Sequence, residues 1–103
     1  MAAGVEFFAI NTHHRAEAFQ ELFGQGDYRG HEVRLVHEPE ILGTGGGIKN
    51  VESLLGDEPF ITCSGDLLTD IAYAPLLKEH ASSGNDVTIA LRETGFGRDV
   101  AFE

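Results

Sequence analysis

The sequence has little of three things on which large classes of protein depend: cysteine, basic residues and long apolar runs. Its single cysteine, Cys63, excludes a disulfide within the chain and fits a reducing cytosol. Seven Lys and Arg stand against seventeen Asp and Glu, and the net charge of -10 argues against binding to nucleic-acid polymers or anionic membranes. No apolar run approaches membrane-spanning length, and the first residues show no signal-peptide pattern. We therefore expect a soluble, cytoplasmic protein.

The amount and kind of sequence present suit one folded unit. A chain of 103 residues is at most one domain, and its hydrophobic fraction of 42% is typical of globular proteins rather than disordered ones. No repeat, linker or low-complexity segment interrupts it. We therefore expect residues 1–103 to belong to a single domain.

Short apolar segments rich in β-forming residues predict four strands. They are residues 5–11 (VEFFAIN), 59–64 (PFITCS), 86–91 (DVTIAL) and, more weakly, 32–37 (EVRLVH). Cys63 lies within one of these segments and is interpreted as a core residue rather than a nucleophile, because no histidine nearby is placed to activate it.

Between these segments, apolar residues recur at helical spacing and predict three helices. Residues 16–23 form the first, with Asn11 and Thr12 as its caps, and residues 48–55 the second, closed by Gly56. Asp70 opens the third, with Pro75 near its first turn, where the missing N–H does little harm. Strands alternating with helices predict an α/β sheet with helices packed on it.

Four glycines fall within five positions of residues 37–50 (HEPEILGTGGGIKN): Gly43, Gly45, Gly46 and Gly47. Backbone amides at a helix start, free of side chains, can cradle a phosphate or a planar ring. The same glycines can instead serve only to turn the chain tightly into its helix. Because the spacing matches neither a Walker loop nor G-x-G-x-x-G, both interpretations stay open.

A carboxylate follows the predicted strand 59–64 by one glycine, in residues 64–70 (SGDLLTD). Gly65 would let the backbone approach a ligand, and Asp66 would lie at the carboxyl end of the sheet, where ligand sites of α/β proteins form. Its oxygens suit Mg²⁺ carried by a nucleoside triphosphate. Alternatively, Asp66 is a turn residue, and Asp70 is more simply a helix cap.

Three segments, in this order and spacing, together resemble sugar-1-phosphate nucleotidyltransferases (NDP-sugar pyrophosphorylases). They are INTHH (residues 10–14), HEPEILGTGGGIKN and GDEPFITCSGDLLTDI (residues 56–71), and they are most similar to the mannose-1-phosphate guanylyltransferase and N-acetylmuramate-1-phosphate uridylyltransferase group. The resemblance covers residues 4–91. It implies a three-layer α/β/α, Rossmann-like (GT-A-like) fold. It also implies transfer of a nucleotidyl group from an NTP to a sugar 1-phosphate, with release of pyrophosphate.

The resemblance also implies roles for individual residues, with Mg²⁺ as cofactor and GTP or UTP as the nucleotide. The positions that match the part of the pattern lying against the nucleobase are Glu38, Leu42, Gly43, Thr44 and Gly45. Gly65 matches the residue beside the ribose, and Asp66 matches the metal-binding aspartate. No residue of this chain is assigned a catalytic role.

Parts of the family pattern are not found in the sequence. These are the GxGTRLxPLT-like loop and Pro-Lys pair that handle the phosphates, the sugar-binding segments and the second metal carboxylate. We therefore expect an incomplete domain that is inactive as this chain alone. A non-catalytic nucleotide-binding module and a structural or oligomerising fragment stay open as alternatives.

The family's first strand would lie between residues 5–11 and 59–64. Without it, these two segments must pair directly, leave a gap or accept a strand from another chain. Because unpaired apolar edges invite association, we expect the chain to self-associate or to be poorly stable.

Overall fold

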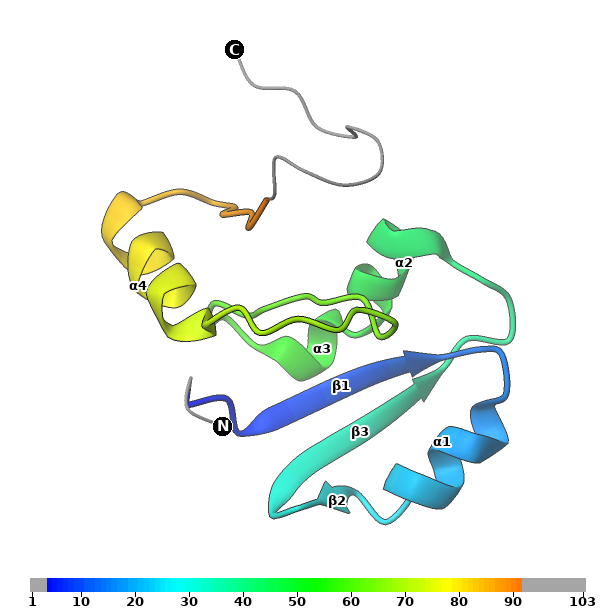
Figure 1. The fold of residues 1–103 in the computed structure, drawn as a ribbon. Helices are drawn as coiled ribbons and strands as arrows, with labels where there is room; N and C mark the ends of the chain where they lie inside the picture. The colour runs from blue at the N-terminus through cyan, green and yellow to red at the C-terminus, as the bar shows by residue number, and fades with distance from the viewer. Residues whose placement is uncertain (1–3, 92–103) are drawn as a thin grey trace. The chain divides into compact units, whose positions relative to one another are not determined.

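The computed structural model describes residues 4–91, and the chain divides into two compact units, Met1–Leu68 and Thr69–Glu103. The first unit contains a mixed three-stranded sheet (Figure 1), with strands β1 (Phe7–Thr12), β2 (Asp27–Tyr28) and β3 (His31–His37) in the order β1-β3-β2. β1 runs parallel to β3, with Phe8 opposite Val33, and β2 is antiparallel to β3. β1 is therefore an edge strand among the described residues.

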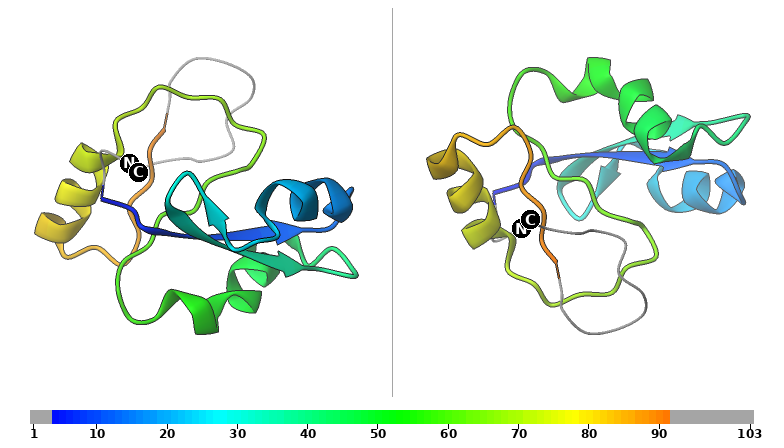
Figure 2. Two further views of the ribbon diagram at one scale, coloured as in Figure 1. Left: turned by 90° about the horizontal axis from the view of Figure 1, so that it is seen from below. Right: turned by 90° about the horizontal axis from the view of Figure 1, so that it is seen from above.

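The first unit also contains three helices: α1 (Ala16–Phe23), α2 (Gly43–Asn50) and α3 (Glu52–Leu55). α1 lies on one face of the β1–β3 pair, and α2 and α3 lie on the other (Figure 2). The second unit contains α4 (Tyr73–Ser83). The parallel β1–α1–β3 connection makes this an α/β protein, as the alternating pattern predicts.

The predictions for the first part of the chain are confirmed within one or two residues. The predicted strands 5–11 and 32–37 are β1 and β3, and the predicted helix 16–23 is α1. The short strand β2 lies between α1 and β3, where no strand was predicted, because residues Asp27 and Tyr28 pair back onto the start of β3. Figure 1 shows this small hairpin beneath β3.

Two predicted strands are wrong: residues 59–64 and 86–91 have no strand structure. A strand is stabilised only when a neighbouring strand satisfies its N–H and C=O groups, and neither segment has one among residues 4–91. Their apolar side chains are correspondingly uncovered, with Phe60 51% and Val87 72% exposed. Cys63, interpreted as a core residue, is exposed for the same reason.

The predictions for the N-terminal ends of α1 and α4 are also wrong. α1 is preceded by Arg15 in the left-handed conformation (φ 52°) without a side-chain cap, because Asn11 bonds elsewhere and Thr12 is buried in β1. α4 begins at Tyr73, not at Asp70. The residue before it, Ala72, is extended, and the Thr69 hydroxyl accepts the Ile71 N–H, which holds this approach out of the helix.

The second predicted helix begins earlier than expected and is interrupted. α2 starts at Gly43, so the glycines form its first turns rather than a loop before it. Val51 (φ -101°, ψ 2°) separates α2 from α3, and Gly56 ends α3 with a positive φ of 66°, as predicted.

Very little apolar surface is buried. Among the described residues, the buried hydrophobic side chains are Val33 on β3 and Val51 between α2 and α3. By contrast Leu68, at the end of the first unit, is 99% exposed. No helix of the described part combines the length and apolar character needed to cross a membrane.

Because the core is small, we expect truncation of a buried valine and of an exposed valine to change the free energy of unfolding by very different amounts. We expect Val33→Ala to lower the free energy of unfolding by about 2 kcal/mol, from the lost transfer energy and the cavity left behind. Val87→Ala, at a position 72% exposed, should change it by less than about 0.5 kcal/mol. Urea titrations followed by circular dichroism measure both; equal effects would mean that Val33 is not a core residue.

Candidate nucleotide site

The carboxyl ends of β1 and β3 hold a cluster of polar groups, which we call the strand-end cluster: Asn11, Thr12, His13 and Glu38. The Glu38 N–H donates to the Thr12 carbonyl at 2.7 Å and extends the parallel pairing past the end of β3. The His13 Nδ1 lies 2.7 Å from the Glu38 carbonyl oxygen. These two contacts fix the backbone of Glu38 on both sides.

The side chain of Glu38 is buried without being satisfied. The residue is 8% exposed, and its Oε1 atom has no hydrogen-bond partner. The ion pairs within residues 4–91 join Arg34 to Glu32 and Lys49 to Glu52, so no cation of this part neutralises Glu38. Since an unmet buried acceptor destabilises a fold by about 1–3 kcal/mol or more, it marks a place where a ligand donor would be favoured.

Gly47 lies beside the unmet Oε1 of Glu38. The Asn11 Nδ2 donates to the Gly47 carbonyl at 3.0 Å and ties α2 to the end of β1. A Cβ atom at Gly47 would lie 3.5 Å from both the Glu38 Oε1 and the Asn11 Nδ2. The glycine therefore leaves a methyl-sized space beside the unmet oxygen.

Glu38 also lines a hollow of about 400 Å³, which we call the Glu38 hollow. It is lined by His37, Glu38, Pro39, Glu40, Leu42 and Asn50. Its size falls within the range of small-ligand sites. It combines an apolar wall at Leu42 with polar groups from the end of β3 and the end of α2.

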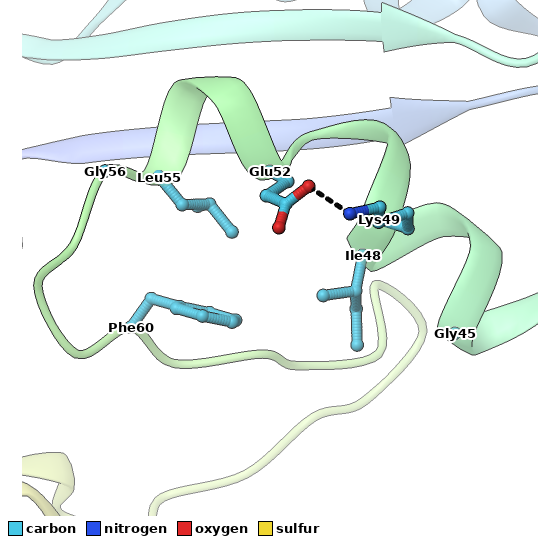
Figure 3. Close-up of a pocket in the computed structure, with 7 residues that line it drawn as sticks. All are labelled: Gly45, Ile48, Lys49, Glu52, Leu55, Gly56 and Phe60. Atoms are coloured by element: carbon cyan, nitrogen blue, oxygen red, sulfur yellow. Dashed lines mark hydrogen bonds and ion pairs between the residues drawn. The ribbon is translucent and has the colours of Figure 1, made fainter.

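A second hollow of about 310 Å³ lies along α2 and α3 (Figure 3). It is lined by Gly45, Ile48, Lys49, Glu52, Leu55, Gly56 and Phe60. Ile48, Leu55 and Phe60 surround the space, while Lys49 and Glu52 form an ion pair at its side. We call it the Phe60 hollow.

The predicted nucleobase residues are thus divided between the Glu38 hollow, the Phe60 hollow and the first turn of α2. Glu38 and Leu42 line the Glu38 hollow, whereas Gly45 lines the Phe60 hollow. Gly43 and Thr44 lie exposed in the first turn of α2.

Gly65 and Asp66 line neither hollow. They form an exposed turn, closed by the Leu67 N–H donating to the Ser64 carbonyl at 3.2 Å. No group of three or more His, Cys, Asp or Glu side chains able to hold a metal ion occurs in the part of the chain that the structure describes. The residues present therefore do not fit a metal site built by the protein alone. A single aspartate fits only an ion that keeps water and phosphate ligands.

Asn11 and His13 are the site residues that sequence reasoning missed. Their positions just after an apolar strand could have indicated a role at the carboxyl end of the sheet. However, the Asn11 contact joins positions 36 residues apart, and the sequence pattern alone does not specify such a contact.

The chain belongs to the nucleotidyl transferase family, whose model matches residues 1–98. It is 37% identical over 94 residues to a mannose-1-phosphate guanylyltransferase from Mycobacterium tuberculosis, covering 91% of this chain and 26% of that protein. It is also 34% identical over 90 residues to an N-acetylmuramate alpha-1-phosphate uridylyltransferase from Neisseria meningitidis, covering 79% of this chain and 38% of that protein.

The resemblance inferred from the three sequence segments is therefore confirmed. A mannose-1-phosphate guanylyltransferase subunit from Danio rerio is 32% identical over 92 residues, covering 86% of this chain and 26% of that protein. The chain spans about a quarter of the length of each of these two guanylyltransferases, from Mycobacterium tuberculosis and Danio rerio. No solved structure matches the chain.

Proposed function

We propose that this chain supplies the nucleobase-binding part of an enzyme of nucleotide-sugar biosynthesis. The enzyme transfers a nucleotidyl group from GTP or UTP to a sugar 1-phosphate. An oxygen of the sugar phosphate attacks the α-phosphorus, a new P–O bond forms, the bond between the α- and β-phosphates breaks, and pyrophosphate leaves. The observation that supports this most directly is the unmet Oε1 of the buried Glu38, at the end of β3.

The proposal extends to the arrangement of the chain around this site. α1 on one face of the sheet and α2 and α3 on the other support a three-layer α/β/α, Rossmann-like arrangement. In it, Gly65 would lie beside the ribose, and Leu42, Gly43, Thr44 and Gly45 against the base. The lone cysteine supports a cytoplasmic location.

We assign Asp66 as a ligand of a metal ion that binds together with the nucleotide. Mg²⁺ is commonly held by one or two carboxylates together with substrate phosphates, and it neutralises charge on a triphosphate. The exposed turn at Asp66 supplies one such carboxylate. Without nucleotide, the described residues should therefore bind Mg²⁺ no better than an ordinary surface carboxylate.

Calorimetric titration of the full chain with GTP and then UTP, each with Mg²⁺, tests this proposal. We expect saturable binding of at least one nucleotide, weakened about 10-fold by Asp66→Ala through loss of a charged contact to the ion. Asp57→Ala removes the same charge from another exposed position and should leave binding unchanged. No binding of either nucleotide would show that this chain does not form the site by itself and would overturn the proposal.

A further inference from the structure

We infer that Asn11 and His13 are positioning residues of the nucleotide site, which hold its two sides, Glu38 and α2, at a fixed spacing. The inference rests on the proposed function, because it takes a nucleotide as the ligand of this site. Both residues belong to the segment INTHH (residues 10–14), to which the proposed function gives no role. Each of them acts through the group that it holds and not through a contact with the nucleotide.

His13 holds Glu38 at a point beyond the end of the sheet. β3 ends at His37, so the Glu38 carbonyl lies past the strand, and the His13 Nδ1 lies 2.7 Å from it. A carbonyl oxygen only accepts hydrogen bonds, so the ring must carry a proton on Nδ1. The Glu38 N–H donates in turn to the Thr12 carbonyl at 2.7 Å. Adjacent residues of β1 and its end thus fix both backbone groups of Glu38, on which the direction of its side chain depends.

Asn11 holds the opposite side through one of the last carbonyls of α2. The last four carbonyls of a helix have no regular donor four residues further on within the helix, and Gly47 provides the first of these four in α2. The N–H of Val51, which would reach it in a longer helix, donates to the Ile48 carbonyl instead. The Asn11 Nδ2 supplies a donor, at 3.0 Å from the Gly47 oxygen. Because Gly47 is buried, water does not readily replace this bond.

The two contacts act on one small space. A Cβ atom at Gly47 would lie 3.5 Å from both the Glu38 Oε1 and the Asn11 Nδ2, so the unmet acceptor and the Asn11 amide flank the same point. The contacts join positions 25 and 36 residues apart, and they tie the end of β1 to both sides of this space. Because hydrogen bonds require donor–acceptor distances of about 2.7–3.2 Å, a ligand that enters here binds best when the spacing is set in advance.

Substitutions of His13 test the inference by calorimetric titration of the full chain with GTP and UTP, each with Mg²⁺. We expect His13→Ala to bind the tighter of the two nucleotides about 5-fold more weakly, for the loss of one hydrogen bond that holds Glu38 in place. His13→Asn should restore the affinity to within about 2-fold, because the asparagine amide can donate from the position of Nδ1. His14→Ala, at the neighbouring exposed position, should leave the affinity unchanged.

A double variant separates positioning from a general effect on the fold. If His13 acts through Glu38, His13→Ala should lower the affinity by less than about 2-fold once Glu38→Ala has removed the carboxylate. The decrease in thermal unfolding midpoint caused by His13→Ala should be similar in both backgrounds, because the backbone carbonyl of residue 38 remains. A purely structural role of His13 would instead lower the affinity equally in both.

Asn11→Asp tests the second contact. The side chain keeps its shape and loses its donor, so a carboxylate oxygen would face the Gly47 carbonyl. We expect the affinity for the same nucleotide to fall at least about 10-fold, because a buried acceptor is left unmet beside a second one.

The outcomes separate this inference from the proposed function. Unchanged affinity in His13→Ala or in Asn11→Asp would overturn the role of the residue altered, and an equal loss from His13→Ala with and without the Glu38 carboxylate would also overturn that of His13. Each of these results would leave the proposed nucleotide site standing. Binding of no nucleotide by the unaltered chain would overturn both. Affinity lost in His13→Ala, recovered in His13→Asn and insensitive to His13 in the Glu38→Ala background would establish the positioning role.

Discussion

The variant Gly47→Ala should bind nucleotide at least about 10-fold more weakly while being more stable than the unaltered chain. Gly47 does not have positive φ and lies inside α2, where alanine is favoured over glycine by about 1 kcal/mol. The added methyl would lie 3.5 Å from the Glu38 Oε1, so it would occupy an approach that a donor needs at about 3 Å. Thermal unfolding and calorimetry with GTP measure the two effects on the same preparation.

Gly45→Ala, at another glycine assigned to the base, tests which of the two hollows the base occupies. A Cβ at Gly45 meets no atom within 4 Å, so the stability gain should be similar. Gly45 lines the Phe60 hollow rather than the Glu38 hollow. If Gly45→Ala weakens binding and Gly47→Ala does not, the base lies along α2 and α3 and not beside Glu38.

The different positions of Gly45 and Gly47 on α2 also show how much of the site the sequence predicts. The glycine-rich segment stands out from the sequence because four glycines follow a predicted strand, whereas Glu38 was identified only through the resemblance to the family. Which face of α2 each glycine occupies depends on where the helix starts, and it starts at Gly43, earlier than the apolar spacing from Ile48 indicates. Residues two apart lie on different faces of a helix, so Gly45 lines the Phe60 hollow, whereas Gly47 lies beside the Glu38 Oε1.

The fold was predictable where contacts are local and was not where they depend on distant partners. β1, α1 and β3 follow one another closely and form one βαβ unit, so their patterns and their structure agree. Residues 59–64 have equally strong β-forming composition and are not a strand. Their composition describes how well they would fit a sheet, and the described part of the sheet ends at β1 without a neighbour for them.

The unpaired edge of β1 predicts self-association of the chain. Among the residues that the structure describes, β1 (FFAINT) pairs with β3 on one side only, and it carries none of the lysines, prolines or bulges by which edge strands avoid pairing with other chains. We expect sedimentation velocity to show species larger than the monomer, increasing with protein concentration. A compact monomer with a cooperative melt would contradict this expectation.

A charge on this edge should reverse the association. We expect Ala9→Lys, in the middle of β1, to shift the chain to monomer at concentrations where the unaltered chain associates, because a lysine on an edge strand opposes pairing with a second copy. Ala18→Lys adds the same charge on the exposed surface of α1 and should leave the association unchanged. Since each copy carries a net charge of -10, raising the ionic strength should strengthen the association of the unaltered chain by screening repulsion. Equal dissociation by both lysines would instead indicate that reduced negative charge, and not the β1 edge, decides whether the copies meet.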